Sequence, residues 1–369
     1  MTSEMAIRGG ACPQQFHQIT AILISFIPPS VAMKAIVISE FGPVENLLFR
    51  EVPLPIPEAG TARIRIHAFG VNHAEMHMRR GEWAESVPIS GIECVGTIDD
   101  CPGGEFPTGL AVASVMGGLG RTINGSYAEY TVARVENIVP LTDSSDQGKL
   151  PLPWDQLAAL PETYCTAWTC LFRNLGLEEG HTLLIRGATS AFGRAALNLA
   201  VHAGAVVVAT TRDEAKFNEL KALGASDAVL EGRDLPARLK SGGQLSNFDR
   251  VLELVGNSTL LESLTLVKRH GRLCLAGWLG GLDPIKDFNP LLQMASGVHF
   301  SFFGSFVFGT PEFPLSDVPL QTIVKAIAKG KFDAKPFKVF KFGEIHEAHR
   351  HMEEGLARGK MVVVIDSET

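Results

Sequence analysis

Hydrophobic and polar positions in the middle of the chain follow two different periods. Residues 182–185 and 205–209 are short unbroken apolar runs, which is typical of buried parallel strands. Between them, small apolar side chains of residues 195–200 recur at helical spacing after a turn that contains glycine. The pattern predicts a strand, a tight turn, a helix and a second strand. Such a unit directs backbone N–H groups and a helix N-terminus toward one point, where a pyrophosphate can bind.

Strands and helices keep alternating after this unit. Helices are predicted over 214–223 and 259–268, and strands over 228–230, 250–254, 272–276 and 298–303. This alternation predicts an α/β fold with a doubly wound parallel sheet, that is, a Rossmann sheet.

The segments on either side have a different pattern. Residues 33–160 contain short strands separated by glycine and proline, which is typical of a small barrel-like β domain. Residues 154–175 are predicted to be helical and to lead into the parallel sheet. After residue 306, helices are predicted near 320–329 and 345–356. A final strand over 361–365 is predicted to return to the β domain.

The glycine turn of the central unit is a candidate pyrophosphate site made of Gly187, Ala188, Thr189, Ser190, Ala191, Phe192 and Gly193. Aligned to G-x-G-x-x-G, the three glycine positions hold Ala188, Ser190 and Gly193. Ser190 adds a side chain where a glycine lets the backbone approach the phosphates, and it adds a hydroxyl that could bond to phosphate. The pattern alone is also compatible with a crossover that binds nothing.

Residues after the second strand favour NADPH over NADH. An NAD site places Asp or Glu at this strand end to hold the ribose 2′-hydroxyl. Here the strand ends in Thr211 and Arg212, with Lys216 one helical turn further on. A hydroxyl and two cations suit a 2′-phosphate, so NADPH is the predicted cofactor. The alternative is that both cations are solvated surface charges, partly offset by Asp213 and Glu214.

Composition sets limits on the class of protein. The chain has 369 residues, enough for two domains, and its net charge of −7 with no basic cluster makes a nucleic-acid partner unexpected. The 6 cysteines form no C-x-x-C pair, which indicates reduced thiols and a cytoplasmic location. The apolar run 19–27 is too short to span a membrane. Residues 1–32 are interpreted as a disordered extension or as preceding a translation start at Met33, and a mitochondrial signal stays open.

Several stretches in the same order resemble the zinc-independent branch of the medium-chain dehydrogenase/reductase superfamily, which includes quinone oxidoreductases and enoyl reductases. They are MKAIVISEFG (33–42), GVNHAEMHMRRG (70–81), PISGIECVGTI (88–98), NGSYAEY (124–130), ETYCTAWTCLF (162–172), the nucleotide unit, and EAHRHMEEGLARGKMVVVI (347–365). The resemblance implies a GroES-like catalytic β domain over 33–160 and 306–369. A Rossmann NADP-binding domain over 161–305 would interrupt it.

The same resemblance argues against a metal. Zinc alcohol dehydrogenases place Cys where Asn72 and His73 stand, and His-Glu where Ile92 and Glu93 stand. A catalytic zinc needs three protein ligands and an open position. Without a Lewis acid, a quinone or an α,β-unsaturated carbonyl is an easier hydride acceptor than a plain ketone, because conjugation spreads the arriving charge.

The resemblance also suggests residues around the reacting atoms. Asn72 matches an asparagine that the family keeps beside the nicotinamide. His77 stands where many members have Tyr, and it could donate a hydrogen bond or a proton. The alternative for His77 is a histidine on a loop or helix face that is bonded to backbone. Trp83 is expected to form a wall of the substrate pocket.

Further positions match the cofactor contacts of relatives. The hydroxyl of Thr166 approaches the cofactor there, although a helix-interior Thr can also bond back to its own backbone. Val255, Gly256 and Gly277 match positions that pass the nicotinamide ribose. Phe303 belongs to a run of phenylalanines that is expected to line the pocket, and the strand edge there could pair with its copy in a homodimer.

Three functions follow from this sequence. The first is an NADPH-dependent reductase of quinones or enone double bonds, acting on small molecules. The second is an enoyl reductase that works beside a polyketide or fatty-acid synthase on a substrate presented by a carrier protein. The third is a non-catalytic NADPH-binding protein, because the altered glycine turn and the missing Tyr could reflect lost activity.

Overall fold

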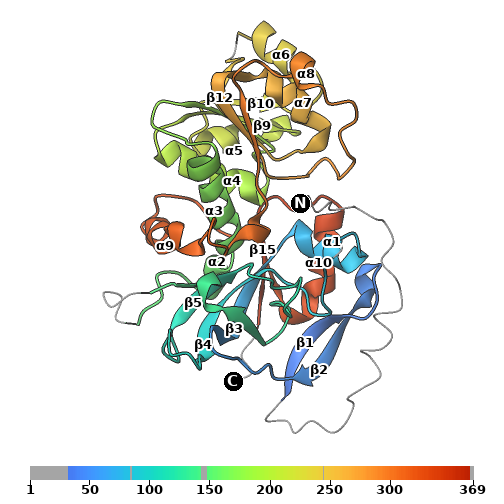
Figure 1. Cartoon of the computed structure of the whole chain (residues 1–369), viewed down its shortest axis with the longest axis vertical. Helices are drawn as coiled ribbons and strands as arrows, with labels where there is room; N and C mark the ends of the chain where they lie inside the picture. The colour runs from blue at the N-terminus through green and yellow to red at the C-terminus, as the bar shows by residue number, and fades with distance from the viewer. Residues whose placement is uncertain (1–31, 84, 143–147, 244, 366–369) are drawn as a thin grey trace, which may run out of the picture.

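The computed structural model describes residues 32–83, 85–142, 148–243 and 245–365. The predictions for residues 1–31 therefore lie outside the described part of the chain. Figure 1 shows two parts along the long axis, with the parallel sheet and its helices at one end and the strands of the N-terminal part at the other. Helices α2 and α3 lie between the two parts.

The parallel sheet has six strands in the order β10-β9-β8-β11-β12-β13. Its strands are β8 (Thr182–Arg186), β9 (Val206–Thr211), β10 (Asp227–Leu230), β11 (Phe248–Glu253), β12 (Val267–Leu275) and β13 (His299–Phe302). All neighbouring pairs are parallel. The chain order reverses between β8 and β11, which makes this a doubly wound sheet and confirms the predicted fold class.

Helices cover both faces of this sheet because side chains alternate along each strand. On β8, Leu183 and Ile185 pack into the core shared with α3 (Pro161–Trp168) and α4 (Ala191–His202). Leu184 packs on the opposite face, in the core formed with α6 (Leu235–Ser241) and α7 (Asn257–Thr265). The short helix α5 (Phe217–Ala222) adds Leu220 to the core shared with α3 and α4, and the short helix α8 (Pro290–Gln293) contacts α7.

The other part is built on a seven-stranded sheet in the order β14-β15-β3-β4-β5-β7, with β6 paired to β3. Its strands are β3 (Thr61–Val71), β4 (Glu93–Asp100), β5 (Ala111–Val115), β6 (Tyr130–Arg134), β7 (Ile138–Pro140), β14 (Lys338–Lys341) and β15 (Met361–Val364). A separate hairpin pairs β1 (Ala32–Ile38) with β2 (Leu47–Pro53). Because β15 pairs antiparallel with β3, the end of the described chain lies in the sheet of the N-terminal part.

Two predicted helices differ from the structure. The helix predicted over 154–175 is three elements: α2 (Trp154–Leu157), α3, and a π-helix over Thr169–Asn174. Pro161 explains the first break, since proline starts a helix well but cannot continue one. The helix predicted over 259–268 ends at Thr265, because buried Val267 begins β12 and pairs with Phe248.

The remaining helices are α1 (His73–Arg80), α9 (Leu320–Ala328) and α10 (Ile345–Glu353). Within the described ranges, no helix combines the length and apolar character needed to cross a membrane. The cysteines in those ranges are free thiols, and all but Cys101 are buried.

Candidate functional site

The predicted pyrophosphate turn joins β8 to α4. Gly187 has a φ of 81°, a conformation that glycine adopts without strain. Ser190 is the N-cap of α4, and its Oγ accepts a hydrogen bond from the backbone N–H of Gly193 at 3.0 Å. The Ser190 hydroxyl therefore stabilises the helix start in addition to any contact with phosphate.

The start of α4 lies very close to the end of β8. A Cβ on Gly193 would stand 2.5 Å from the carbonyl oxygen of Gly187 and 2.6 Å from the Cα of Ala188. Only glycine fits there without a shift of the backbone. The first N–H groups of a helix lack intrahelical acceptors, and no described residue accepts from Ala191 or Phe192. These two N–H groups are available to an anion.

Loops after β11 and β12 meet the same turn. A Cβ on Gly187 would lie 3.4 Å from the Cβ of Leu254 and 3.8 Å from the Cγ2 of Val255. Glu253 ends β11, and its Oε1 accepts from the backbone N–H groups of Val255 at 2.7 Å and Gly256 at 3.0 Å. This fully buried carboxylate, for which the sequence suggests no role, fixes the loop predicted to pass the nicotinamide ribose.

Gly277, the third residue of the predicted ribose contact, lies against the same loop. A Cβ on Gly277 would stand 2.7 Å from the carbonyl oxygen of Leu254. A Cβ on Gly256 would stand 2.9 Å from the carbonyl oxygen of Gly277. The loops after β8, β11 and β12 therefore gather at one edge of the sheet, where α/β folds bind nucleotides.

The residues predicted for the 2′-phosphate stand in different environments. Thr211 is buried and its Oγ1 accepts from the backbone N–H of Asp213 at 3.2 Å. The Nζ of Lys216 bonds Glu219 at 2.8 Å, and Arg194 pairs with the same carboxylate. The side chain of Arg212 is exposed and contacts no described partner. Arg212 is thus the cation of this corner most available to a ligand.

A buried polar network, formed by Asn72, Glu93 and Lys360, lies in the sheet of the β domain. The Nζ of Lys360 donates to the Oδ1 of Asn72 at 2.5 Å and to the Oε1 of Glu93. The Nδ2 of Asn72 donates to the same Glu93 oxygen at 2.9 Å. Glu93 is fully buried and Lys360 nearly so. The amide of Asn72, predicted to stand beside the nicotinamide, is therefore held on both sides.

Glu162 extends this network toward the parallel sheet. Its backbone N–H donates to the Oε2 of Glu93 at 2.8 Å. Its Oε1 accepts from the hydroxyl of Thr166 at 3.1 Å and from that of Ser305 at 2.6 Å, whereas its Oε2 is buried without a partner among the described residues. Burial, with the nearby Glu93 carboxylate, raises the pKa of Glu162 to about 7. The Thr166 hydroxyl faces this carboxyl group instead of its own backbone.

A line of rings forms a second link between the two parts of the molecule. The ring of His77 stacks on Trp83 with centroids 5.4 Å apart, and its Nδ1 pairs with Glu82. The guanidinium of Arg121 lies 5.7 Å from the Trp83 ring and 5.0 Å from the Phe306 ring.

The line continues on the sheet side. The ring centroids of Phe306 and Phe302 are 6.4 Å apart, and those of Phe302 and Trp278 are 5.6 Å apart. Phe302 and Phe306 are about half exposed, at 50% and 49%. We call this set of side chains (His77, Trp83, Arg121, Phe306, Phe302 and Trp278) the aromatic wall.

The structure changes the assignment of Phe303. This ring is only 2% exposed and packs against Phe308 and Phe313, with centroids 5.6 and 5.5 Å away. Neighbouring side chains on an extended segment point to opposite sides, so Phe302 faces outward where Phe303 faces the core. Phe302 and Phe306 are the rings of this run that a ligand can reach.

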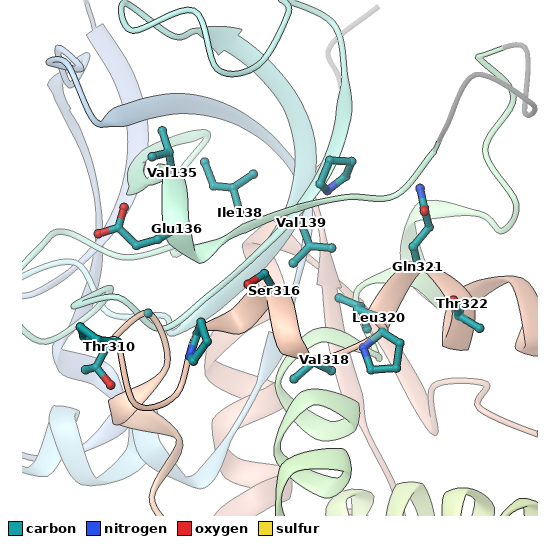
Figure 2. A pocket seen from close by; sticks show the side chains of 15 residues that line it. Val135, Glu136, Ile138, Val139, Thr310, Ser316, Val318, Leu320, Gln321 and Thr322 are labelled. Atoms are coloured by element: carbon teal, nitrogen blue, oxygen red, sulfur yellow. The ribbon is translucent and has the colours of Figure 1, made fainter. Parts of the chain in front are cut away.

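Two cavities lie outside the predicted site or at its edge. The larger, of about 580 Å³, is an open groove between the segments 135–140 and 309–322. Figure 2 shows its lining, in which Val139, Val318 and Leu320 stand near one another. None of its lining residues was predicted to bind cofactor or substrate. The smaller, of about 30 Å³, lies between α3 and α4, and Lys360 lines it.

Sequence reasoning missed Glu162, Ser305, Arg121 and Lys360 as members of the site. One signal was present: Glu162 is the only charged residue between Asp155 and Arg173. A lone carboxylate in an apolar helix is buried and needs partners. For Ser305 and Arg121 the sequence carried no comparable signal, because their partners come from distant segments.

Comparisons with known proteins agree with this architecture. The model of the zinc-binding dehydrogenase family matches residues 191–320, and that of the alcohol dehydrogenase GroES-like domain matches residues 58–143. A quinone oxidoreductase of Pongo abelii is 27% identical over 346 residues, which cover 90% of this chain and 98% of that protein. Polyketide synthase GfsB of Streptomyces halstedii is 26% identical over 309 residues, 84% of this chain but 5% of that protein.

Solved structures give the same result at the level of the fold. The crystal structure of AibC has a TM-score of 0.79 at 24% identity and covers 93% of this chain and 99% of its own. The structure of mycobacterial Rv1454c complexed with NADPH has a TM-score of 0.76 at 22% identity and covers 90% and 99%. Together with the family models, these matches confirm the predicted combination of a GroES-like β domain and a Rossmann sheet.

Proposed function

This chain belongs to the medium-chain dehydrogenase/reductase superfamily, in its quinone oxidoreductase and enoyl reductase branch. We propose that this oxidoreductase reduces a quinone, or the C=C bond of an α,β-unsaturated carbonyl, with NADPH and without zinc. The observation that carries the proposal is the bond between Ser305 and Glu162, because it joins the edge of the parallel sheet to the buried Asn72–Glu93–Lys360 network.

The residues present fit a dinucleotide. The N–H groups of Ala191 and Phe192 at the start of α4 suit a pyrophosphate, and the fit of Gly193 against Ala188 keeps the helix start close to the strand. Thr189 and Ser190 complete the turn. Arg212, supported by Thr211 and Lys216, would hold the 2′-phosphate. When bound, NADPH supplies the hydride.

Residues of the loops and of α3 would position the nicotinamide end. Val255, Gly256 and Gly277 would contact the ribose, and Glu253 keeps that loop in place. Thr166 stands at the carboxyl group of Glu162, and Asn72 stands at the far end of the same network. These residues orient the reactants, and orientation is a large part of what such a reaction needs.

Zinc independence is supported by the position of Lys360. Its ammonium lies between the oxygens of Asn72 and Glu93, at the positions where related zinc enzymes carry their ligands. A second cation in the same place would be repelled by this one.

A conjugated, planar acceptor suits the aromatic wall. The half-exposed rings of Phe302 and Phe306 offer apolar surface to a flat substrate, and Trp83 closes the wall from the β domain. His77 Nδ1 is paired with Glu82, which leaves Nε2 as the ring nitrogen that can contact a carbonyl oxygen.

A second candidate is a trans-acting enoyl reductase of polyketide or fatty-acid synthesis. The match to a segment of polyketide synthase GfsB favours it. In that case the substrate is an enoyl thioester on a carrier protein. The chemistry at the site is the same, because both substrates accept hydride at the carbon β to a carbonyl.

Two further features belong to the proposal. Free thiols are typical of the cytoplasm, where we place the enzyme. Strand β13 pairs only with β12 among the described strands, so its open edge is available to a second copy in a homodimer.

The deciding experiment measures NADPH oxidation by the purified full chain with quinones, small enones and enoyl thioesters. Turnover of quinones or small enones supports the first candidate, and turnover of thioesters alone supports the second. NADPH binding without turnover of any acceptor would instead indicate a non-catalytic NADPH-binding protein.

A further inference from the structure

Glu162 differs from the other buried acids of the described residues in one respect, because one of its carboxyl oxygens is buried without a hydrogen-bond partner, whereas the equally buried Glu75 accepts from Asn72 and from the Ile92 backbone N–H. The Oε1 of Glu162 bonds two hydroxyl groups, those of Thr166 and Ser305, while its Oε2 has no partner among the described residues. By contrast, the buried Glu93 bonds Lys360 and the buried Glu253 bonds two backbone N–H groups. A carboxyl group without a cationic partner is most stable in its neutral form, which carries a proton.

Ser305 connects this acid to the aromatic wall. It is partly exposed, whereas Glu162 is buried, and its hydroxyl lies 2.6 Å from the Glu162 oxygen. Its neighbour Phe306 is half exposed and contacts Arg121. A hydroxyl can accept one proton while it donates another, so Ser305 can pass a proton outward from the acid behind it.

We propose that Glu162 and Ser305 form a proton relay that completes the reduction, with Ser305 as the residue that touches the substrate and Glu162 as its acid. This inference rests on the proposed function and adds to it the source of the proton. The resemblance to relatives suggests His77 as the proton donor. The Nδ1 of His77, however, is already paired with Glu82.

The step balances as follows for an enone. Hydride and its two electrons come from NADPH, which is oxidised, and form the new C–H bond at the β-carbon. The resulting enolate takes a proton from the Ser305 O–H to form the C–H bond at the α-carbon. The O–H bond of Glu162 breaks and its proton restores Ser305. Glu162 ends as a carboxylate and regains a proton from solvent.

The charged groups around Glu162 agree with this role. Glu93, on β4, opposes ionisation of Glu162, whereas the ammonium of Lys360 favours it. With a pKa of about 7, Glu162 can be protonated at neutral pH and can still release its proton. The rate should therefore fall as pH rises above about 7, because the acid form is lost.

Glu162→Gln and Ser305→Ala test the relay. Gln keeps the size of Glu162 and can still accept from both hydroxyl groups, but it has no acid proton. We expect kcat to fall by about 10²-fold in each variant, since general acids contribute about 10²–10⁴-fold, with the Kd for NADPH unchanged. The fall in rate above pH 7 should disappear in Glu162→Gln. Ser305→Thr should recover much of kcat. Ser301→Ala is the matched control and should behave as wild type, because it removes a hydroxyl that is bonded to the Leu273 carbonyl and lies outside the relay.

A second readout is independent of turnover. Infrared difference spectra of the ligand-free protein should show protonated carboxyl bands that titrate near pH 7, from Glu162 and from the buried Glu75, whose pKa burial also raises to about 7. The Glu162 band is the part of this signal that is lost in Glu162→Gln and kept in Glu75→Gln. An unchanged kcat and pH profile in Glu162→Gln and Ser305→Ala would overturn the relay. If none of the tested acceptors supports NADPH oxidation by the wild type, the proposed function is contradicted instead. The infrared band would still report whether Glu162 holds a proton.

Discussion

The ammonium of Lys360 lies 2.5 Å from the Oδ1 of Asn72, although 288 positions separate the two residues in the chain. Lys360 stands just before β15, and Asn72 just after β3, so the antiparallel pairing of these strands brings them together. The return of the chain to the β domain therefore places the ammonium of Lys360 beside the buried carboxyl group of Glu93, with which it forms an ion pair.

Replacing Lys360 by Met should strongly destabilise the fold. The variant keeps the length of the side chain but leaves the buried carboxyl group of Glu93 without its cationic partner. Breaking a buried ion pair by removing one partner costs about 3–5 kcal/mol. The free energy of unfolding from urea titration should fall by that amount. Lys331→Met, at an exposed position, is the matched control and should change it little. Equal stability of Lys360→Met and wild type would show that the pair does not hold the site.

The purified protein should contain well under one zinc per chain. Lys360 supplies a positive charge between Asn72 and Glu93, so a metal ion there would face a fixed cation. Elemental analysis gives the metal content, and treatment with a chelator should leave activity intact. Stoichiometric zinc whose removal abolishes turnover would return plain alcohols and ketones to the possible substrates.

Local sequence patterns predict most of this fold, because periodicity reports which side of an element is buried. The run over 182–185 and the helical spacing over 195–200 correspond to β8 and α4. Predicted boundaries were wrong where tertiary pairing decides them. Val267 joins β12 because Phe248 pairs with it across the sheet, a contact that no local pattern contains.

The candidate site is less predictable for the same reason. The turn from Gly187 to Gly193 is contiguous, and the sequence shows it directly. Glu162, Glu93, Ser305 and Lys360 come from four separate segments of the chain. A pattern along the chain cannot show that Ser305 meets Glu162, since their contact depends on how the two domains pack.

The stability of the protein should depend on Glu162 in a defined pH window. Its pKa is raised from 4.5 to about 7 because burial disfavours the charged form. The folded state then binds the proton more tightly than the unfolded state. The stabilisation is complete below about pH 4.5 and is lost as pH rises through 7. Each pKa unit corresponds to about 1.36 kcal/mol. Across this window the free energy of unfolding of wild type should therefore fall by up to about 3 kcal/mol relative to that of Glu162→Gln. Urea titrations of both proteins at pH 5 and pH 8 measure the difference, and parallel curves would contradict it.

Phe306→Ala should weaken binding of the acceptor without affecting the cofactor. The variant removes the ring that lies 5.0 Å from the Arg121 guanidinium and opens the aromatic wall. Loss of an aromatic contact of about 0.5–1.5 kcal/mol corresponds to a rise in KM for a quinone of about two- to twelvefold. Phe300→Ala on β13 is the control, because Phe300 is similarly exposed, at 40%, but lies outside the wall. An equal rise in KM for both variants would show that the wall is not specific.

Arg212→Ala should separate NADPH from NADH. Arg212 is exposed at the end of β9, and no described residue pairs with it, so its guanidinium is available to a 2′-phosphate. A charge-assisted hydrogen bond of about 1.5–3 kcal/mol corresponds to a Kd for NADPH weakened by about ten- to a hundredfold, with NADH little changed. Titration of wild type and variant with both cofactors measures the four constants. Arg269→Ala, an exposed cation near the opposite end of the sheet, should change none of them. If wild type binds NADH as tightly as NADPH, or if Arg212→Ala weakens both equally, Arg212 is a surface charge and the 2′-phosphate assignment is wrong.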